Sequence, residues 1–153
     1  MDTAVVHAGQ SPDPTTGAVN VPIYASSTYA QLAPGEHLGF DYSRTINPTR
    51  LAFERCVADL ETGMQGVAFA SGMSAIAAVL ALLAVGDHII VADDLYGGTY
   101  RYMEQVCRPQ FHLDFTYVDA TDPNAVEQAI TRKTRMIWLE SPSNPLLKIT
   151  DIQ

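Results

Sequence analysis

The segment HIIVADDLYGGTYRYMEQVC, residues 88–107, decides the fold class. It begins with the run His88–Ala92, passes through a loop with paired glycines, and continues as a helix predicted from Thr99 to Cys107. A short, nearly continuous apolar run is typical of a strand that is buried on both faces of a parallel sheet. The segment is therefore predicted to be one strand–helix unit of an α/β fold.

The same alternation of strands and helices continues on both sides of this segment. Further strands are predicted at Val67–Ala70, Leu113–Val118 and Met136–Glu140. The other predicted helices run from Pro48 to about Gly63, from Ser71-Gly72-Met73-Ser74 to about Leu83, and from Pro123, capped by Asp122, to Thr131. Strands that alternate with helices of this length indicate βαβ units, and hence a mostly parallel, doubly wound sheet with flanking helices.

The first 45 residues have a different pattern. They contain Pro12, Pro14, Pro22 and Pro34 among many Gly, Ser and Thr residues, and they show no sustained helical period. We therefore expect residues 1–47 to form an extended arm that packs on something else, and residues 48–153 to begin the main domain. Because the chain stops soon after Ile149-Thr150-Asp151 has begun another element, we expect the remainder of that domain and a C-terminal domain to be missing.

Composition excludes several classes of protein. The net charge of −8 argues against nucleic-acid binding, which requires excess Lys and Arg. The longest apolar stretch, residues 75–85, is about half as long as a membrane span, and the N-terminus lacks a signal pattern. Cys56 and Cys107 lack metal-site spacing and are expected to be reduced, buried thiols. The sequence thus predicts a soluble, cytoplasmic protein without a metal site.

Three polar loops follow predicted strands, where open α/β sheets bind their ligands. The Ser71-Gly72-Met73 turn opens a helix and offers backbone N–H groups to an anion, although it could be an ordinary helix cap. Tyr96 lies before paired glycines and could stack on a flat heterocycle, act as an acid or base, or only pack. Asn144 stands between two prolines as a rigid polar group or a simple turn residue.

A fourth feature lies in the arm. Tyr42 and Arg44 are two residues apart, so in an extended chain both side chains project from one face. A Tyr hydroxyl and a guanidinium together suit a phosphate group, and a surface ion pair is the alternative interpretation.

The motifs YSRTINPTR, FASGMSAI, DDLYGGTYR and WLESPSNPLLKITDI, together with PIYASSTY at residues 22–29, resemble the Cys/Met-metabolism PLP-dependent enzymes. This family contains cystathionine γ-lyases, γ-synthases and β-lyases, methionine γ-lyases and O-acyl-homoserine sulfhydrylases. The resemblance covers essentially the whole chain. It implies the fold of the type I PLP-dependent transferases and pyridoxal 5'-phosphate (PLP) as cofactor.

The resemblance also implies roles for the residues in the four loops. Tyr42 and Arg44 would grip the cofactor phosphate of a neighbouring subunit, so that a homodimer shares its active sites and assembles further into a tetramer. Gly72 and Met73 would donate backbone N–H groups to the same phosphate. Tyr96 would stack on the pyridine ring and take part in proton transfer, and Asn144 would face the hydroxyl group of the ring.

The exact reaction depends on finer details of the resemblance. Methionine γ-lyases typically carry cysteine at the position of Gly98, so glycine favours the enzymes that act on cystathionine. Arg101 resembles an arginine that can reach the distal carboxylate of such a substrate, although it could simply face solvent. We expect a cystathionine γ-lyase, which converts cystathionine to cysteine, 2-oxobutanoate and ammonia. A γ-synthase or an O-acyl-homoserine sulfhydrylase is the alternative.

One family feature is missing from the sequence. The lysine that forms the Schiff base with PLP, and the acidic partner of the pyridine nitrogen, follow the asparagine loop in the family. This chain has only Lys133 and Lys148, and we interpret both as structural. We therefore expect these 153 residues to be a segment of a longer enzyme that is inactive alone. A truncated domain that only binds is the alternative from another class.

Overall fold

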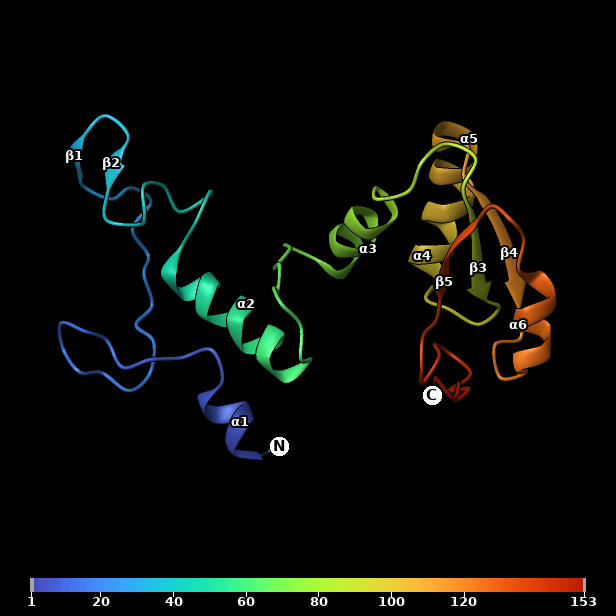
Figure 1. Cartoon of the computed structure of the whole chain (residues 1–153), viewed down its shortest axis with the longest axis horizontal. Helices are drawn as coiled ribbons and strands as arrows, with labels where there is room; N and C mark the ends of the chain where they lie inside the picture. The colour runs from blue at the N-terminus through green and yellow to red at the C-terminus, as the bar shows by residue number, and fades with distance from the viewer. Residues whose placement is uncertain (1, 153) are drawn as a thin grey trace. The chain divides into compact units, whose positions relative to one another are not determined.

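The computed structural model describes residues 2–152 of the chain. They divide into two compact units, one up to Ala68 and the other from Phe69 onward, which we describe separately. Figure 1 shows the elements of each unit along the chain.

The first unit is built around one long helix. Its elements are α1 (Asp2–His7), the short antiparallel strands β1 (Gln31–Ala33) and β2 (Glu36–His37), and α2 (Pro48–Leu60). The predicted start of α2 is confirmed, and its cap is Asn47, whose side-chain oxygen accepts hydrogen bonds from the N–H groups of Thr49 and Arg50 at 2.9 and 3.3 Å. The expected irregular character of the first 45 residues is confirmed outside α1 and the hairpin, which the sequence did not reveal.

The second unit alternates helices and strands. Its elements are α3 (Gly72–Leu80), β3 (His88–Ala92), α4 (Gly97–Tyr102), the π-helical turn η1 (Met103–Cys107), α5 (Arg108–Phe111), β4 (Asp114–Val118), α6 (Pro123–Ala129) and β5 (Thr134–Trp138). The strands form a parallel sheet in the order β4-β3-β5, so the predicted α/β class and parallel pairing are confirmed. Asp122 caps α6 as expected, accepting from the N–H of Asn124.

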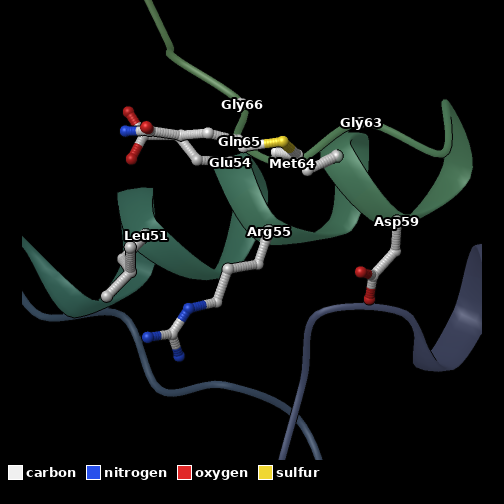
Figure 2. A pocket seen from close by; sticks show the side chains of 9 residues that line it. Leu51, Glu54, Arg55, Asp59, Gly63, Met64, Gln65 and Gly66 are labelled. Carbon is white, nitrogen blue, oxygen red and sulfur yellow. The ribbon is translucent and has the colours of Figure 1, made fainter.

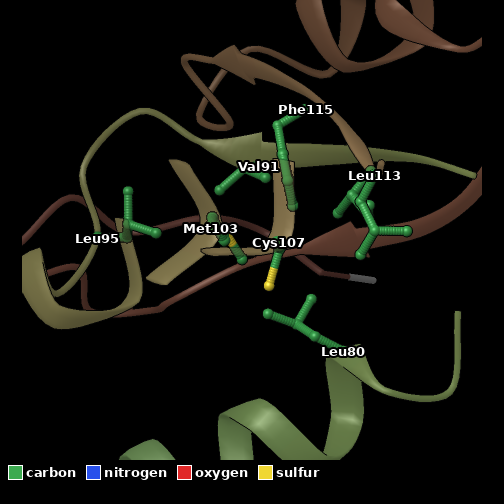
Figure 3. Packing of buried hydrophobic residues seen from close by; sticks show 8 residues of the cluster. Leu80, Val91, Leu95, Met103, Cys107, Leu113 and Phe115 are labelled. Atoms are coloured by element: carbon green, nitrogen blue, oxygen red, sulfur yellow. The ribbon is translucent and has the colours of Figure 1, made fainter. Parts of the chain in front are cut away.

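Side chains from opposite faces of the sheet enter different layers. On one face, a buried cluster joins Val91 of β3 to Met103 and Cys107 of η1 and to Leu80 of α3, and Figure 3 shows Leu80 pointing toward the sulfur of Cys107. On the other face, Ile137 of β5 shares a hollow with apolar side chains of α6. Helices therefore lie on both faces of the sheet, which is the doubly wound arrangement that the sequence predicted.

One predicted strand is wrong, and other boundaries differ. Residues Val67–Ala70 form no strand, and the N–H of Ala68 donates to the Glu54 carboxylate at 3.0 Å. An apolar run becomes a strand only where a neighbouring backbone pairs with it, and no described segment does so here. β5 starts and ends two residues before the predicted Met136–Glu140. The helix after β3 begins at Gly97, not Thr99, and continues beyond Cys107 through Pro109 to Phe111.

The two cysteines are free thiols. Cys107 is buried in the cluster shown in Figure 3, and this burial raises the pKa of its thiol, whereas Cys56 on α2 is half-buried. Within residues 2–152, no group of His, Cys, Asp or Glu side chains is arranged to hold a metal ion. None of the described helices has the length and apolar character needed to cross a membrane.

Met103 provides a test of this core. Its side chain is fully buried in the cluster with Val91 and Leu80, so Met103→Ala leaves a cavity and should lower the free energy of unfolding by about 2–5 kcal/mol. Urea denaturation followed by circular dichroism measures the change. Leu82→Ala is the matched control, because Leu82 is 81% exposed and should change stability by less than about 0.5 kcal/mol. Equal effects of both substitutions would contradict the position of the core.

Candidate active site

The parallel register brings three loops to one edge of the sheet. Ala92 of β3 is paired with Val118 of β4, and Val91 is paired with Trp138 of β5. The chain therefore leaves all three strands at the same level. Since the connections from β3 to β4 and from β4 to β5 run in opposite directions across the sheet, the strand order reverses between β3 and β5. Ligands of open α/β sheets bind in the crevice at such a reversal.

Tyr96 lies in the loop after β3, at the N-terminal end of α4. Its N–H donates to both carboxylate oxygens of Glu140, at 3.2 and 3.0 Å, from the loop after β5. Its ring lies directly against Gly98, where an added Cβ would come within 2.4 Å of Tyr96 Cε1. Tyr96 remains 48% exposed, so a ligand can still reach it.

Asp94 joins the same two loops a second time: it lies in the loop after β3 and accepts hydrogen bonds from the loop after β5. Its carboxylate is 8% exposed and accepts hydrogen bonds from the hydroxyl of Ser143 and from the N–H of Leu146, the latter at 2.9 Å. A buried carboxylate is tolerated only when such donors compensate for lost hydration. Asn144 stands between these two donors and is exposed, so the structure places it in a loop that is fixed on both sides.

Lys148 completes the connection between the strand ends. Its Nζ lies 2.9 Å from Asp93, which follows β3, and 3.3 Å from Asp119, which follows β4. The Asp93 hydrogen bond raises the pKa of Lys148, and hydrogen bonds from Thr121, with Lys148 as a smaller cause, lower the pKa of Asp119. These ion pairs agree with the structural role that we expected for Lys148.

The Ser71–Met73 turn opens α3 as predicted. Ser71 is the N-cap, and its hydroxyl accepts from the N–H of Ser74 at 3.1 Å. Gly72 and Met73 belong to the first helical turn, whose N–H groups have no acceptor within the helix. Gly72 is exposed, and the space where a Cβ would stand is open to 4 Å. The turn can therefore accept an anion at close range. The helix cap by itself also explains why a serine stands at position 71.

Arg101 lies one turn into α4, near the Tyr96 loop. Its Nη1 is 3.5 Å from the position that a Cβ on Gly97 would take, so the guanidinium folds back toward the start of the helix. Arg101 is exposed, and within residues 2–152 no acidic side chain forms an ion pair with it.

Tyr42 and Arg44 lie in the first unit and contact each other. The Arg44 guanidinium carbon is 5.0 Å from the centroid of the Tyr42 ring, and both side chains are exposed. Their backbone is held by Arg50, whose guanidinium donates to the carbonyl oxygens of Ser43 and Thr45 at 3.2 and 2.7 Å. The pair is therefore presented from a well-supported segment, with both functional ends open.

The sequence alone missed Glu140 and Asp94 as parts of this site. Both are acidic residues just beyond the end of a strand, and that position was the available signal. Neither could be assigned, because each partner lies in another loop, 44 residues from Glu140 and 49 residues from Asp94 along the chain.

A separate hollow of about 230 Å³ lies on α2 in the first unit, and Figure 2 shows Arg55 and Asp59 pointing to the same side of that helix. Its acidic groups already have partners in the fold. Glu54 accepts from the N–H of Ala68, and Asp59 accepts from the N–H of Gly9 at 2.9 Å. The hollow is therefore accounted for by these internal contacts, and the strand-end loops remain the candidate site.

Comparison with known proteins identifies the family. The family profile described as Cys/Met metabolism PLP-dependent enzyme matches residues 2–153. The chain is 60% identical to a cystathionine beta-lyase of Coxiella burnetii over 152 residues, covering 99% of this chain and 39% of that protein. It is 51% identical to a cystathionine gamma-lyase of Bacillus subtilis, covering 98% of this chain and 39% of that protein.

Solved structures agree with this result. The crystal structure of cystathionine gamma-lyase from Lactobacillus plantarum complexed with L-serine matches with a TM-score of 0.89 at 52% identity, over 97% of this chain and 39% of that chain. The chain thus spans about two fifths of the length of these relatives. Family profile, sequence identity and fold lead to one conclusion: this chain belongs to the Cys/Met-metabolism PLP-dependent enzymes, whose cofactor is pyridoxal 5'-phosphate.

Proposed function

We propose that the protein containing this sequence is a PLP-dependent lyase that cleaves cystathionine by γ-elimination to cysteine, 2-oxobutanoate and ammonia. The observation that carries the proposal is the pair of joined loops at the strand reversal, which present Tyr96 and Asn144 on a rigid support. Gly98 supports the choice of cystathionine, since methionine γ-lyases typically carry cysteine at this position; here the Tyr96 ring lies where such a side chain would begin.

The donors of the chain fit a phosphorylated aromatic cofactor. The N–H groups of Gly72 and Met73 suit the phosphate, and the exposed ring of Tyr96 suits stacking on a flat heterocycle. Asn144 offers an amide to a ring hydroxyl. When bound, PLP withdraws electrons from the carbon atoms of the amino acid and so supplies the chemistry of elimination.

The side chains of the chain would then position the substrate and move protons. The Tyr96 hydroxyl would hold or transfer a proton near the amino group of the substrate. Arg101 would bind the distal carboxylate, because its guanidinium is exposed and turned toward the Tyr96 loop. Tyr42 and Arg44 would bind the phosphate of a neighbouring subunit, so the functional unit would be a homodimer with shared sites.

A second candidate reaction is β-elimination of the same substrate, which yields homocysteine, pyruvate and ammonia. The specific observation in its favour is the 60% identity to the cystathionine beta-lyase of Coxiella burnetii.

Incubating the protein with PLP and cystathionine, and identifying the products by mass spectrometry, tests the function. We expect cysteine and 2-oxobutanoate. Homocysteine and pyruvate would establish the second candidate instead. Consumption of an O-acyl-homoserine only when cysteine is present would indicate a γ-synthase, and the absence of PLP binding and of any product would overturn the enzyme proposal.

Arg44 tests the shared site. Arg44→Ala removes a charge-assisted phosphate contact worth about 1.5–3 kcal/mol, so the dissociation constant of PLP should rise roughly 10- to 150-fold. Equilibrium dialysis followed by absorbance measures the change. Arg132→Ala, in an exposed basic turn, is the matched control and should leave the constant unchanged.

Mixed dimers show whether Arg44 acts across the interface. Combining an Arg44→Ala subunit with a Tyr96→Phe subunit should restore one intact site, because both changes then damage the same site of the dimer. If Arg44 served its own subunit, each site would carry one defect and no activity would return.

Tyr96→Phe tests the proton-transfer role. The ring remains, so PLP should stay bound, while loss of the hydroxyl should slow turnover by about 10²- to 10⁴-fold. Absorbance of the bound cofactor and steady-state kinetics measure the two effects. Unchanged turnover would make Tyr96 a packing residue, and loss of PLP would assign its hydroxyl to cofactor binding instead of proton transfer.

A further inference from the structure

We propose that Glu140 is a positioning residue: from the end of β5, its carboxylate fixes the backbone of Tyr96 and thereby the place of the Tyr96 ring. The inference rests on the proposed function, because it assigns Glu140 a role only if Tyr96 serves the cofactor or substrate. Glu140 itself need not touch either of them.

The contact between the Glu140 carboxylate and the Tyr96 N–H fixes the residue at which the loop ends and α4 begins. Both oxygens of Glu140 accept from the single N–H of Tyr96, so the donor stays engaged if either oxygen moves. Tyr96 is the N-cap of α4, and its own side chain makes no capping hydrogen bond. An ionised acceptor forms a stronger hydrogen bond than a neutral one, which suits a contact that must fix a loop.

Fixing this backbone also fixes the ring. The Tyr96 ring lies against Gly98, with Cδ1 and Cζ both 3.1 Å from the position of an added Cβ. The ring therefore rests on the first turn of the helix, and a shift of the Tyr96 N–H carries the ring with it. Stacking on a flat ligand depends on the plane and height of the ring, so small shifts of this backbone matter for binding.

Glu140 has the firm support that a positioning residue requires. It follows β5 by two residues, and β5 pairs with the buried strand β3. Beyond Glu140, the loop returns to the β3 side, where Asp94 accepts from Ser143 and Leu146. Each loop therefore supplies a carboxylate to the other: Asp94 holds the Asn144 loop, and Glu140 holds the Tyr96 loop.

The experiment compares Glu140→Ala with Glu140→Gln in the PLP-loaded protein. The amide oxygen of Gln can still accept from the Tyr96 N–H, so Glu140→Gln should keep kcat within about threefold. Glu140→Ala should lower kcat about 10- to 100-fold with little change in KM, as expected for a misplaced catalytic group. Without cofactor, hydrogen exchange of the Tyr96 amide should accelerate at least tenfold in Glu140→Ala and remain slow in Glu140→Gln.

The Tyr96→Ala background separates positioning from an independent role. If Glu140 acts through Tyr96, adding Glu140→Ala to the Tyr96→Ala variant should have no further effect on kcat or on the circular dichroism of bound PLP. Glu127→Ala, at an exposed position of α6, is the matched control and should change neither. Full additivity, equal damage from Glu140→Gln and Glu140→Ala, or unchanged Tyr96 amide exchange in Glu140→Ala would overturn the inference. If Tyr96→Ala itself has no effect, the proposed function fails instead, whatever the amide exchange shows.

Discussion

The site depends on one constraint, the parallel register of β3 with β4 and β5. This register makes three strands end at the same level, so the acidic residues Asp93, Asp119 and Glu140 leave the sheet along one edge. Carboxylates so placed repel one another unless donors lie between them. Lys148 lies between the first two, and the Tyr96 N–H meets the third. The same contacts that relieve the repulsion also hold the loops together.

Each of the two loops carries a carboxylate that accepts hydrogen bonds from the other loop, and this makes the site rigid. Asp94 is buried and therefore has to keep its donors, because an unpaired carboxylate in that position would be costly. Tyr96 and Asn144 remain exposed while the residues beside them are fixed. Polar groups held in place before the ligand arrives lose little entropy on binding, which favours both cofactor retention and catalysis. The residues that hold the loops are thus different from the exposed residues to which we assign binding and catalysis in the proposed function.

In the first unit, too, hydrogen bonds hold the backbone beside exposed polar side chains. Asn47 caps α2, and its Nδ2 donates to the carbonyl oxygen of Tyr24 at 2.9 Å, so the helix start also fixes the segment before it. Arg50 donates to the carbonyl oxygens next to Arg44. The motif that contains Tyr42 and Arg44 therefore includes its own support. Both side chains remain exposed, and the Arg44 guanidinium lies over the Tyr42 ring.

The α/β class, three of the four predicted strands, and the loops that carry Tyr96 and Asn144 could be predicted from the sequence, because apolar periodicity and turn chemistry are local properties. It predicted a strand at residues 67–70 wrongly, since pairing requires a partner that no local pattern reveals. Which charged groups meet their partners depends on the tertiary structure. The partners of Glu140 and Asp94 follow from strand order and register, and these depend on how distant apolar faces pack together rather than on the residues beside each carboxylate.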